Sequence, residues 1–360
     1  MTERIAIMGA GAIGGSIGAY LIREGLDVTL IDQWAAHIDK MKRDGLRLTD
    51  LKEDFTVPVK AFHISEASNI REGFDIVYLS VKSYDTRWSA HLIESLLKPT
   101  GFVLPAQNAL NDELVASIIG YSRTVGCVPS ISAGVYEPGH IVRTDPMVTH
   151  CFTVGELHGL VTPRVRSVVE ALKALGPSDA TTNIWGARWG KMLVNCMGNA
   201  LAGIIGPDHS KMTGEQRDTA GMIRAAAGCE VVRVAEALGV VVEPLAATGV
   251  TADEFVKATS LQGILALRGR MDQGAERRSL SADQISRLGV PGRASLLQDV
   301  IKGRRTEVEE LNGHVVRKGK EVGVPTPVNG AIVDTMNRIE AGSLRPTPEN
   351  VDLLRSYLPH

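Results

Sequence analysis

The chain has 360 residues, of which 44% are hydrophobic, and its 39 basic and 41 acidic residues leave a net charge of −2 at pH 7. This length suffices for a large core in about two domains, and the balanced charge excludes a basic surface for nucleic acid. Aromatic residues make up only 4%, which disfavours a base-stacking surface, and the four separated cysteines without CxxC spacing predict neither a zinc site nor a disulfide framework.

The N-terminal segment is interrupted by glycine soon after its short apolar run, so no signal peptide is predicted. No stretch of 18 apolar residues occurs, which excludes a predicted membrane span. Cysteine usage favours a reducing compartment. We therefore expect a cytoplasmic protein that has neither a membrane nor a nucleic acid as partner.

The first half alternates short β-branched runs with helical patterns, which is typical of βαβ units and a parallel sheet. Around Ser130–Leu157 the pattern predicts an antiparallel hairpin at the sheet edge, with its turn at Glu137-Pro138-Gly139. The predicted helices are Ala12–Glu24, Trp34–Arg43 and Tyr84–Leu97. The predicted strands are Arg4–Met8, Asp27–Ile31, Asp75–Val81, Gly101–Pro105 and Thr124–Val128.

Strand patterns end near residue 180, and helical periodicity replaces them. This change predicts a Rossmann domain over residues 1–180, an all-α domain over 181–345 and a tail over 346–360. The predicted helices of the second half are Ala187–Ile205, Glu215–Leu238, Ala252–Met271, Ala294–Ile301, Thr306–Val322 and Asn329–Ala341.

A GxGxxG motif directly follows the first predicted strand. Its glycines permit a tight turn, close approach of a pyrophosphate and close packing of helix on strand, and the helix N-terminus attracts phosphate. The alternative is a tight strand–helix turn that binds nothing. The predicted dinucleotide loop consists of Gly9, Ala10, Gly11, Ala12, Ile13 and Gly14.

Two charged residues follow later strands of the same predicted sheet. Asp32 ends the second strand, where a carboxylate accepts hydrogen bonds from ribose hydroxyls and repels a 2′-phosphate, so it favours NAD over NADP. The alternative role of Asp32 is to cap the next helix. Lys82 follows a buried strand, where it contacts either cofactor phosphate and ribose or solvent only.

Lys191, Asn195 and Asn199 lie at i, i+4 and i+8 on a predicted helix that is otherwise apolar or small. A buried polar stripe must find partners or face a wet site, whereas a solvent-facing stripe is the alternative. A lysine there can act as a general acid and can stabilise a developing alkoxide.

Glu307 shares a predicted helical stripe with Leu311 and Val315 and therefore points with the apolar face. In the alternative interpretation it is a first-turn acid that the helix dipole favours. The sequence pattern alone supports these two interpretations equally.

The chain resembles the ketopantoate reductase (2-dehydropantoate 2-reductase) family of the 6-phosphogluconate dehydrogenase-like superfamily. The matching motifs are collinear from about residue 3 to about residue 330. They are the glycine motif and the segments Val81–Thr86, Gln107–Leu110, Glu137–Gly139, Trp189–Asn199, Ser295–Asp299 and Thr306–Gly313.

The resemblance implies a Rossmann domain followed by a helical domain, with a 2-oxo acid bound between them and reduced with NADPH. It assigns catalytic roles to Lys191 and Glu307. It further implies that Lys82 contacts the cofactor and that the nicotinamide and substrate lie near Asn108. The implied substrate-binding residues are Asn195, Asn199, Ser295 and Asn108.

Three departures from the family pattern bear on its transfer to this chain. Asp32-Gln33 stands where the family often has an arginine for the 2′-phosphate, and Ala109 replaces a glycine after Asn108. The segment Leu245–Arg293 is longer than is usual and ends just before Ser295. We therefore expect reduction of a 2-oxo acid with NAD or NADP, with ketopantoate and pantothenate biosynthesis as the family default. The alternative is an NAD-dependent dehydrogenase of a larger hydroxy acid, and a homodimer is plausible.

Overall fold

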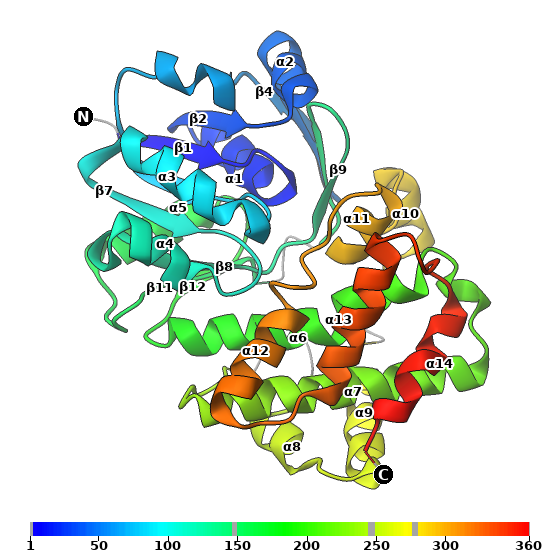
Figure 1. The fold of residues 1–360 in the computed structure, drawn as a ribbon. Coiled ribbons are helices and arrows are strands. Elements are labelled where there is room, and N and C mark those ends of the chain that lie inside the picture. The colour runs from blue at the N-terminus through cyan, green and yellow to red at the C-terminus, as the bar shows by residue number, and fades with distance from the viewer. Residues whose placement is uncertain (1–2, 146–149, 244–248, 276–279, 360) are drawn as a thin grey trace. The chain divides into compact units, whose positions relative to one another are not determined.

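The computed structural model describes residues 3–145, 150–243, 249–275 and 280–359 (Figure 1). The described residues form two compact units. Unit 1 comprises those within 1–184 and 280–292, and unit 2 comprises those within 185–279 and 293–360. Parts of the predicted insertion, residues 245–248 and 276–279, lie outside the described residues.

Unit 1 is built on a five-stranded parallel sheet with the order β5-β2-β1-β6-β7. The chain runs outward from the central β1 to β2 and β5, then returns to β6 and β7 on the other side of β1. The strand order therefore reverses beside β1, where sheets of this kind bind ligands. The strands are β1 Arg4–Met8, β2 Asp27–Asp32, β5 Lys60–His63, β6 Phe74–Leu79 and β7 Leu97–Pro105.

Both faces of this sheet are covered, which explains the continuously apolar strands. In β1, Ile5 and Ile7 point into one core with α1 and α5, whereas Ala6 and Met8 point into a second core with α3 and α4. The helices of unit 1 are α1 Ala12–Arg23, α2 Ala35–Asp44, α3 Thr86–Leu96, α4 Asp112–Ile119, α5 Pro163–Leu172 and α10 Ala282–Leu288.

The predicted hairpin forms, but it is not at the edge of the parallel sheet. Strands β9 Ala133–Glu137 and β10 His140–Arg143 pair antiparallel, and β10 also pairs with β3 in a separate sheet of order β4-β3-β10-β9. The strand predicted at Thr124–Val128 also belongs to another sheet, of order β12-β11-β8. The remaining strands are β3 Leu46–Thr49, β4 Asp54–Val57, β8 Val125–Pro129, β11 Phe152–Glu156 and β12 Ser178–Ala180.

Unit 2 is helical throughout its described residues. The helix predicted over Ala252–Met271 is interrupted, because Ala258 leaves helical geometry and separates α8 from α9. The predicted C-terminal tail belongs to unit 2, where Val351 and Leu354 are buried. The helices are α6 Ile184–Ile205, α7 Gly214–Ala237, α8 Ala252–Lys257, α9 Leu261–Ala275, α11 Ser295–Ile301, α12 Asn312–Val322, α13 Pro327–Glu340 and α14 Val351–Leu354.

Both units also contain short 3₁₀ helices: η1 Ile64–Asn69, η2 Ser83–Asp85, η3 Tyr121–Arg123, η4 His209–Lys211, η5 Pro348–Asn350 and η6 Arg355–Tyr357.

Within the described ranges, none of the helices combines the length and apolar character that a membrane span requires. In the part of the chain that the structure describes, no disulfide bond joins the cysteines, and all four are buried: Cys127, Cys151, Cys196 and Cys229.

Candidate active site

The three glycines of the GxGxxG motif differ in what surrounds them. Gly9 has φ +93°, and a Cβ there would lie 2.7 Å from the backbone carbon of Ser80. A Cβ on Gly14 would lie 2.0 Å from the carbonyl oxygen of Gly9, so helix α1 can pack closely on β1 only with glycine at this position. A Cβ on Gly11 would meet no atom of the described residues within 4 Å. Gly11 is therefore the glycine whose missing side chain leaves space for something outside the chain.

The loop joins β1 to the N-terminus of α1 at the point where the strand order reverses. The N–H of Gly9 donates to the carbonyl of Ile31 (2.8 Å), and the N–H of Ser80 donates to that of Met8 (2.7 Å). These bonds fix the loop to both neighbouring strands. Because Gly11 is the N-cap of α1 and supplies no capping side chain, the first N–H groups of the helix are suited to an anionic ligand. The loop fits a dinucleotide pyrophosphate.

Asp32 ends β2 and is half-buried. Its Oδ1 accepts a hydrogen bond from the N–H of Trp34 (2.8 Å). Helix α2 begins at Ala35 with Trp34 as its N-cap, so the alternative in which Asp32 caps this helix is wrong. The carboxylate is instead fixed at the carboxyl end of β2, in the position where a ribose hydroxyl would be recognised.

Two further loops follow β6 and β7, and side-chain hydrogen bonds join them. Gln107 donates to the carbonyl of Val81 (2.8 Å), and the side chain of Asn111 donates to the hydroxyl of Ser83 (3.1 Å). Lys82, in the β6 loop, is half-buried, so it is not a fully solvated lysine. The predicted cofactor residues thus lie at the carboxyl ends of four neighbouring strands, β2, β1, β6 and β7.

Ala109 has φ 65°, in the left-handed region that favours glycine. It occupies the position where the family pattern has glycine, and it is 6% exposed. Alanine therefore adopts here a backbone conformation that glycine adopts more readily. The effect of the departure is to add one buried methyl group.

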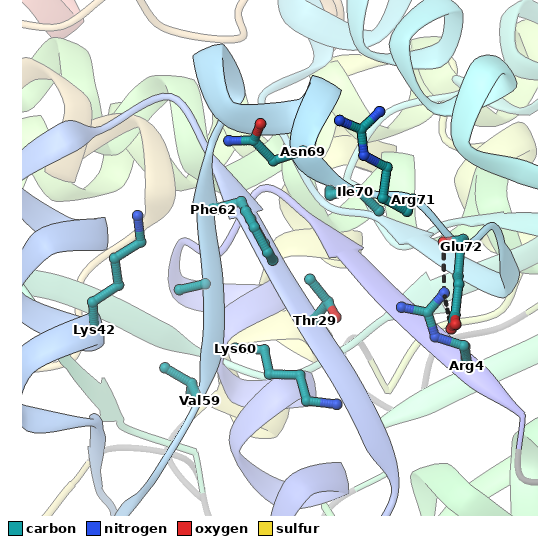
Figure 2. A pocket seen from close by; sticks show the side chains of 11 residues that line it. Arg4, Thr29, Lys42, Val59, Lys60, Phe62, Asn69, Ile70, Arg71 and Glu72 are labelled. Carbon is teal, nitrogen blue, oxygen red and sulfur yellow. Dashed lines mark hydrogen bonds and ion pairs between the residues drawn. The ribbon is translucent and has the colours of Figure 1, made fainter.

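An open pocket of about 490 Å³ lies elsewhere on unit 1, beside β5 (Figure 2). Three of its four cationic side chains are paired with acids: Lys42 with Glu66 (2.6 Å), Arg4 with Glu72 (3.3 Å) and Lys60 with Asp27 (2.6 Å). None of its lining residues is a predicted cofactor residue. This pocket is therefore separate from the glycine loop.

In unit 2, the polar stripe lies on α6. Asn195 is only 3% exposed, and Lys191 and Asn199 are half-buried, so the alternative of a solvent-facing stripe is wrong. The Nδ2 of Asn199 donates to the Oδ1 of Asn195 (3.2 Å). The Nδ2 of Asn195 is buried and has no hydrogen-bond acceptor in the described part of the chain. A buried amide donor without a partner is costly, so this N–H group is available to a ligand.

Ser295 is the first residue of α11 and contacts this stripe, although it lies 96 residues after Asn199 in the sequence. Asn199 Nδ2 also donates to Ser295 Oγ (3.1 Å), so three of the predicted substrate residues form one hydrogen-bonded chain. The turn before Ser295 is held by Gln298, whose amide donates to the carbonyl of Arg293 (3.1 Å). The structure therefore assembles Asn195, Asn199 and Ser295 within unit 2.

Glu307 is 4% exposed, but it does not lie on a helix, because α12 begins at Asn312. The predicted helical stripe and the first-turn alternative are both wrong for this residue. Glu307 occupies a turn whose preceding residue is fixed by α13: Glu340 accepts hydrogen bonds from the hydroxyl of Thr306 and from its N–H (2.9 Å). Its burial thus comes from the turn and not from helical periodicity.

One buried network supports these elements and was not predicted from the sequence. Glu230 on α7 accepts from the N–H groups of Val328 (2.8 Å) and Asn329 (2.9 Å) at the start of α13. Asn329 accepts from the amide of Asn312 (2.8 Å), which also donates to the carbonyl of Cys196 on α6 (3.2 Å). Burial raises the pKa of Glu230 to about 7. An isolated Glu in a long helical pattern gave no signal of this role.

Comparison with known families identifies the whole architecture. The profile described as Ketopantoate reductase PanE/ApbA matches residues 5–157, and the profile of its C-terminal part matches residues 183–340. The chain belongs to the ketopantoate reductase family. It is therefore an oxidoreductase of this family, with an N-terminal Rossmann domain and a helical C-terminal region, as the sequence predicts.

Curated relatives and solved structures agree with this family. A protein of Archaeoglobus fulgidus named 2-dehydropantoate 2-reductase is 28% identical, over 94% of this chain and 99% of its own length. A ketopantoate reductase structure from Ralstonia eutropha JMP134 has a TM-score of 0.72 and 26% identity, over 94% of this chain and 99% of its own. A structure titled D-mandelate dehydrogenase with NADH and anilino(oxo)acetate shares the fold, with a TM-score of 0.75 at 22% identity, over 94% of this chain and 99% of its own.

Proposed function

We propose that this chain reduces a small 2-oxo acid to the 2-hydroxy acid with a nicotinamide cofactor, and that ketopantoate is its substrate. Relatives of full length carry the corresponding name at up to 28% identity. The observation that carries the proposal is the unpaired Nδ2 of Asn195, on the same helix face as Lys191. A buried donor beside a lysine suits an anionic substrate whose carbonyl oxygen gains charge during reduction.

The residues that would hold the cofactor are those at the carboxyl ends of β1, β2, β6 and β7. The glycine loop binds the pyrophosphate, Asp32 accepts from the adenosine ribose, Lys82 contacts cofactor phosphate or ribose, and Asn108 lies near the nicotinamide. Bound NADH or NADPH supplies the hydride. Because a carboxylate at Asp32 repels a 2′-phosphate, NADH is the preferred cofactor in this proposal.

Unit 2 supplies the proton and binds the substrate. The Lys191 ammonium stabilises negative charge as it develops on the carbonyl oxygen and then donates a proton to it. Asn195 Nδ2 donates to the substrate carboxylate. Asn199 is the link that keeps Asn195 and Ser295 in place, and Ser295 contacts the polar end of the substrate. Glu307 orients the substrate or the Lys191 ammonium.

A second candidate is an NAD-dependent dehydrogenase of a larger hydroxy acid. Asp32 and the long segment Leu245–Arg293, which ends two residues before Ser295, favour it. It uses the same lysine and the same hydride chemistry, so a panel of 2-oxo acids of increasing size separates it from ketopantoate reduction.

A homodimer is part of the proposal. Leu261 and Leu265 are exposed one turn apart on α9 and offer an apolar contact in unit 2. Light scattering during size-exclusion chromatography measures the mass directly.

The test is steady-state turnover of ketopantoate with NADH and with NADPH, for the wild type and Lys191→Ala. We expect Lys191→Ala to lower kcat by about 10²-fold or more while the cofactor Kd is unchanged. The control is Lys211→Ala, because Lys211 is an exposed lysine of the same unit, in an ion pair with the exposed Asp208 (3.0 Å). A near wild-type rate for Lys191→Ala would refute its role, and a preference for NADPH would refute the role of Asp32.

A further inference from the structure

His37 is a fully buried side chain that contacts the glycine loop. It lies on α2 with an exposed fraction of 0%. Its Nδ1 is 2.8 Å from the backbone nitrogen of Gly139, and its Nε2 is 3.0 Å from the carbonyl oxygen of Ala10. The imidazole therefore joins α2, the β9–β10 turn and the second residue of the glycine loop.

These two contacts determine the tautomer. The Gly139 N–H can only donate, so Nδ1 must accept and carries no proton. The proton is therefore on Nε2, which donates to the carbonyl of Ala10. Burial also lowers the pKa of His37, against the opposing influences of the bond to the Ala10 carbonyl and of the Asp32 carboxylate, and so favours the neutral ring. A neutral ring with the proton on Nε2 satisfies both neighbours.

The bond to Ala10 sets the direction of the next N–H group. The Ala10 carbonyl and the Gly11 N–H belong to one trans peptide, in which they point in opposite directions. With the carbonyl held on His37, the Gly11 N–H points away from the imidazole. Gly11 is the residue beside which the structure leaves open space, and its N–H is a donor that a pyrophosphate would accept from.

The imidazole is itself held in place. The ring of Trp34 stacks on it, with 5.1 Å between centroids and 12° between planes, and the N–H of Trp34 donates to Asp32 (2.8 Å). On the other side, the carbonyl of Gly139 accepts from the N–H of Arg47 (2.9 Å). His37 thus connects the residue proposed to bind ribose with the loop proposed to bind pyrophosphate.

We propose that His37 is a positioning residue for the cofactor: its Nε2–H holds the Ala10 carbonyl and thereby directs the Gly11 N–H toward the pyrophosphate of a nicotinamide dinucleotide. This inference rests on the proposed use of such a cofactor. It does not depend on which 2-oxo acid is reduced.

Two substitutions separate the two hydrogen bonds of the ring. In His37→Gln the longer amide reaches the position of Nε2 and can still donate to Ala10, but the acceptor for Gly139 is lost. In His37→Asn the shorter amide oxygen takes the position of Nδ1 and still accepts from Gly139, but the donor to Ala10 is lost. Each variant keeps one hydrogen bond of the ring and loses the other, so each serves as the control for the other.

NADH binding is measured by tryptophan fluorescence, and stability by urea unfolding. We expect His37→Asn to raise the Kd for NADH by about fivefold, the value of one hydrogen bond, and His37→Gln to stay within about twofold of the wild type. The kcat at saturating NADH should be similar in both. Equal losses of affinity in the two variants, no loss in either, or a greater loss in His37→Gln would overturn the proposal.

The tautomer of His37 can be measured in the wild type, so this test does not depend on whether His37→Asn folds. Nitrogen-15 spectra of histidine-labelled protein, assigned with His37→Gln, should show the Nε2–H tautomer for His37 with NADH bound, and the Nδ1–H tautomer would overturn the proposal. If the wild type binds NADH but reduces no 2-oxo acid, the proposed function is wrong. The role of His37 can then still be tested, because it is measured by the Kd for NADH of the wild type and the two variants. If the wild type binds neither NADH nor NADPH, both are overturned.

Discussion

Substitution of Gly11 by alanine should make the protein more stable and a poorer binder of NADH. The backbone of Gly11 has φ −70° and ψ −155°, which alanine can adopt, and the added Cβ would meet no atom of the described residues within 4 Å. Because alanine reduces the freedom of the unfolded chain, we expect the free energy of unfolding to rise by about 0.4–1 kcal/mol. The same methyl group would occupy the space that the pyrophosphate needs. A tenfold increase in Kd corresponds to about 1.4 kcal/mol, and we expect at least this loss.

Two other glycines provide controls for this experiment. A Cβ on Gly14 would lie 2.0 Å from the Gly9 carbonyl oxygen and 2.7 Å from Ile7 Cγ2, so Gly14→Ala should cost about 3 kcal/mol of stability or more. Gly269 is exposed on α9, and no atom of the described residues lies within 4 Å of its Cβ position, so Gly269→Ala should gain about 1 kcal/mol and leave NADH binding unchanged.

Urea unfolding followed by circular dichroism gives the stabilities, and titration calorimetry gives the Kd for NADH. If Gly11→Ala binds NADH as tightly as the wild type does, the pyrophosphate is not held at this loop. If Gly11→Ala is less stable than the wild type, the space around this residue is not open as described.

Two further predictions concern unit 2. The substitution Asn195→Asp keeps the oxygen that accepts from Asn199 but replaces the unpaired amide donor with an oxygen. We therefore expect KM for the 2-oxo acid to rise at least tenfold, while the Kd for NADH stays unchanged. An unaltered KM would show that Asn195 does not bind the substrate. Burial raises the pKa of Glu230 to about 7, so the folded state binds this proton more tightly than the unfolded chain does, and the wild type loses that stability as pH rises from about 4.5 to about 7. Glutamine does not titrate, so the free energy of unfolding of Glu230→Gln lacks this pH dependence. The free energy of unfolding of the wild type minus that of the variant, measured with urea, should therefore fall by roughly 2–3 kcal/mol between pH 5 and pH 8. A difference that does not change with pH would contradict the raised pKa.

The sequence predicted the elements whose signal is local. The apolar run of β1, the glycine motif and the i, i+4, i+8 stripe of Lys191, Asn195 and Asn199 are all local patterns, and each lies on the element where it was expected. The four-residue strands β3, β4 and β5 were missed, since so short a segment shows no reliable period.

Contacts between distant residues could not be predicted. Glu307 is buried in a turn that Glu340 holds through Thr306, and helical periodicity carries no information about such a turn. The contact of His37 with Gly139 spans 102 residues, and a histidine in an amphipathic helix gives no sign of it. The resemblance to the family named Asn199 and Ser295 as substrate residues, but their hydrogen bond emerges only in the folded chain.

The burial of all four cysteines has a practical consequence for experiments on this protein. Each is at most 1% exposed, and burial raises the pKa of Cys229 to about 11 and that of Cys196 further still. Thiol reagents react with exposed thiolates, so the native chain should be almost inert toward maleimides. A single cysteine introduced on the surface would then carry a fluorophore or spin label without background, and the wild-type sequence can serve directly as the scaffold for such measurements.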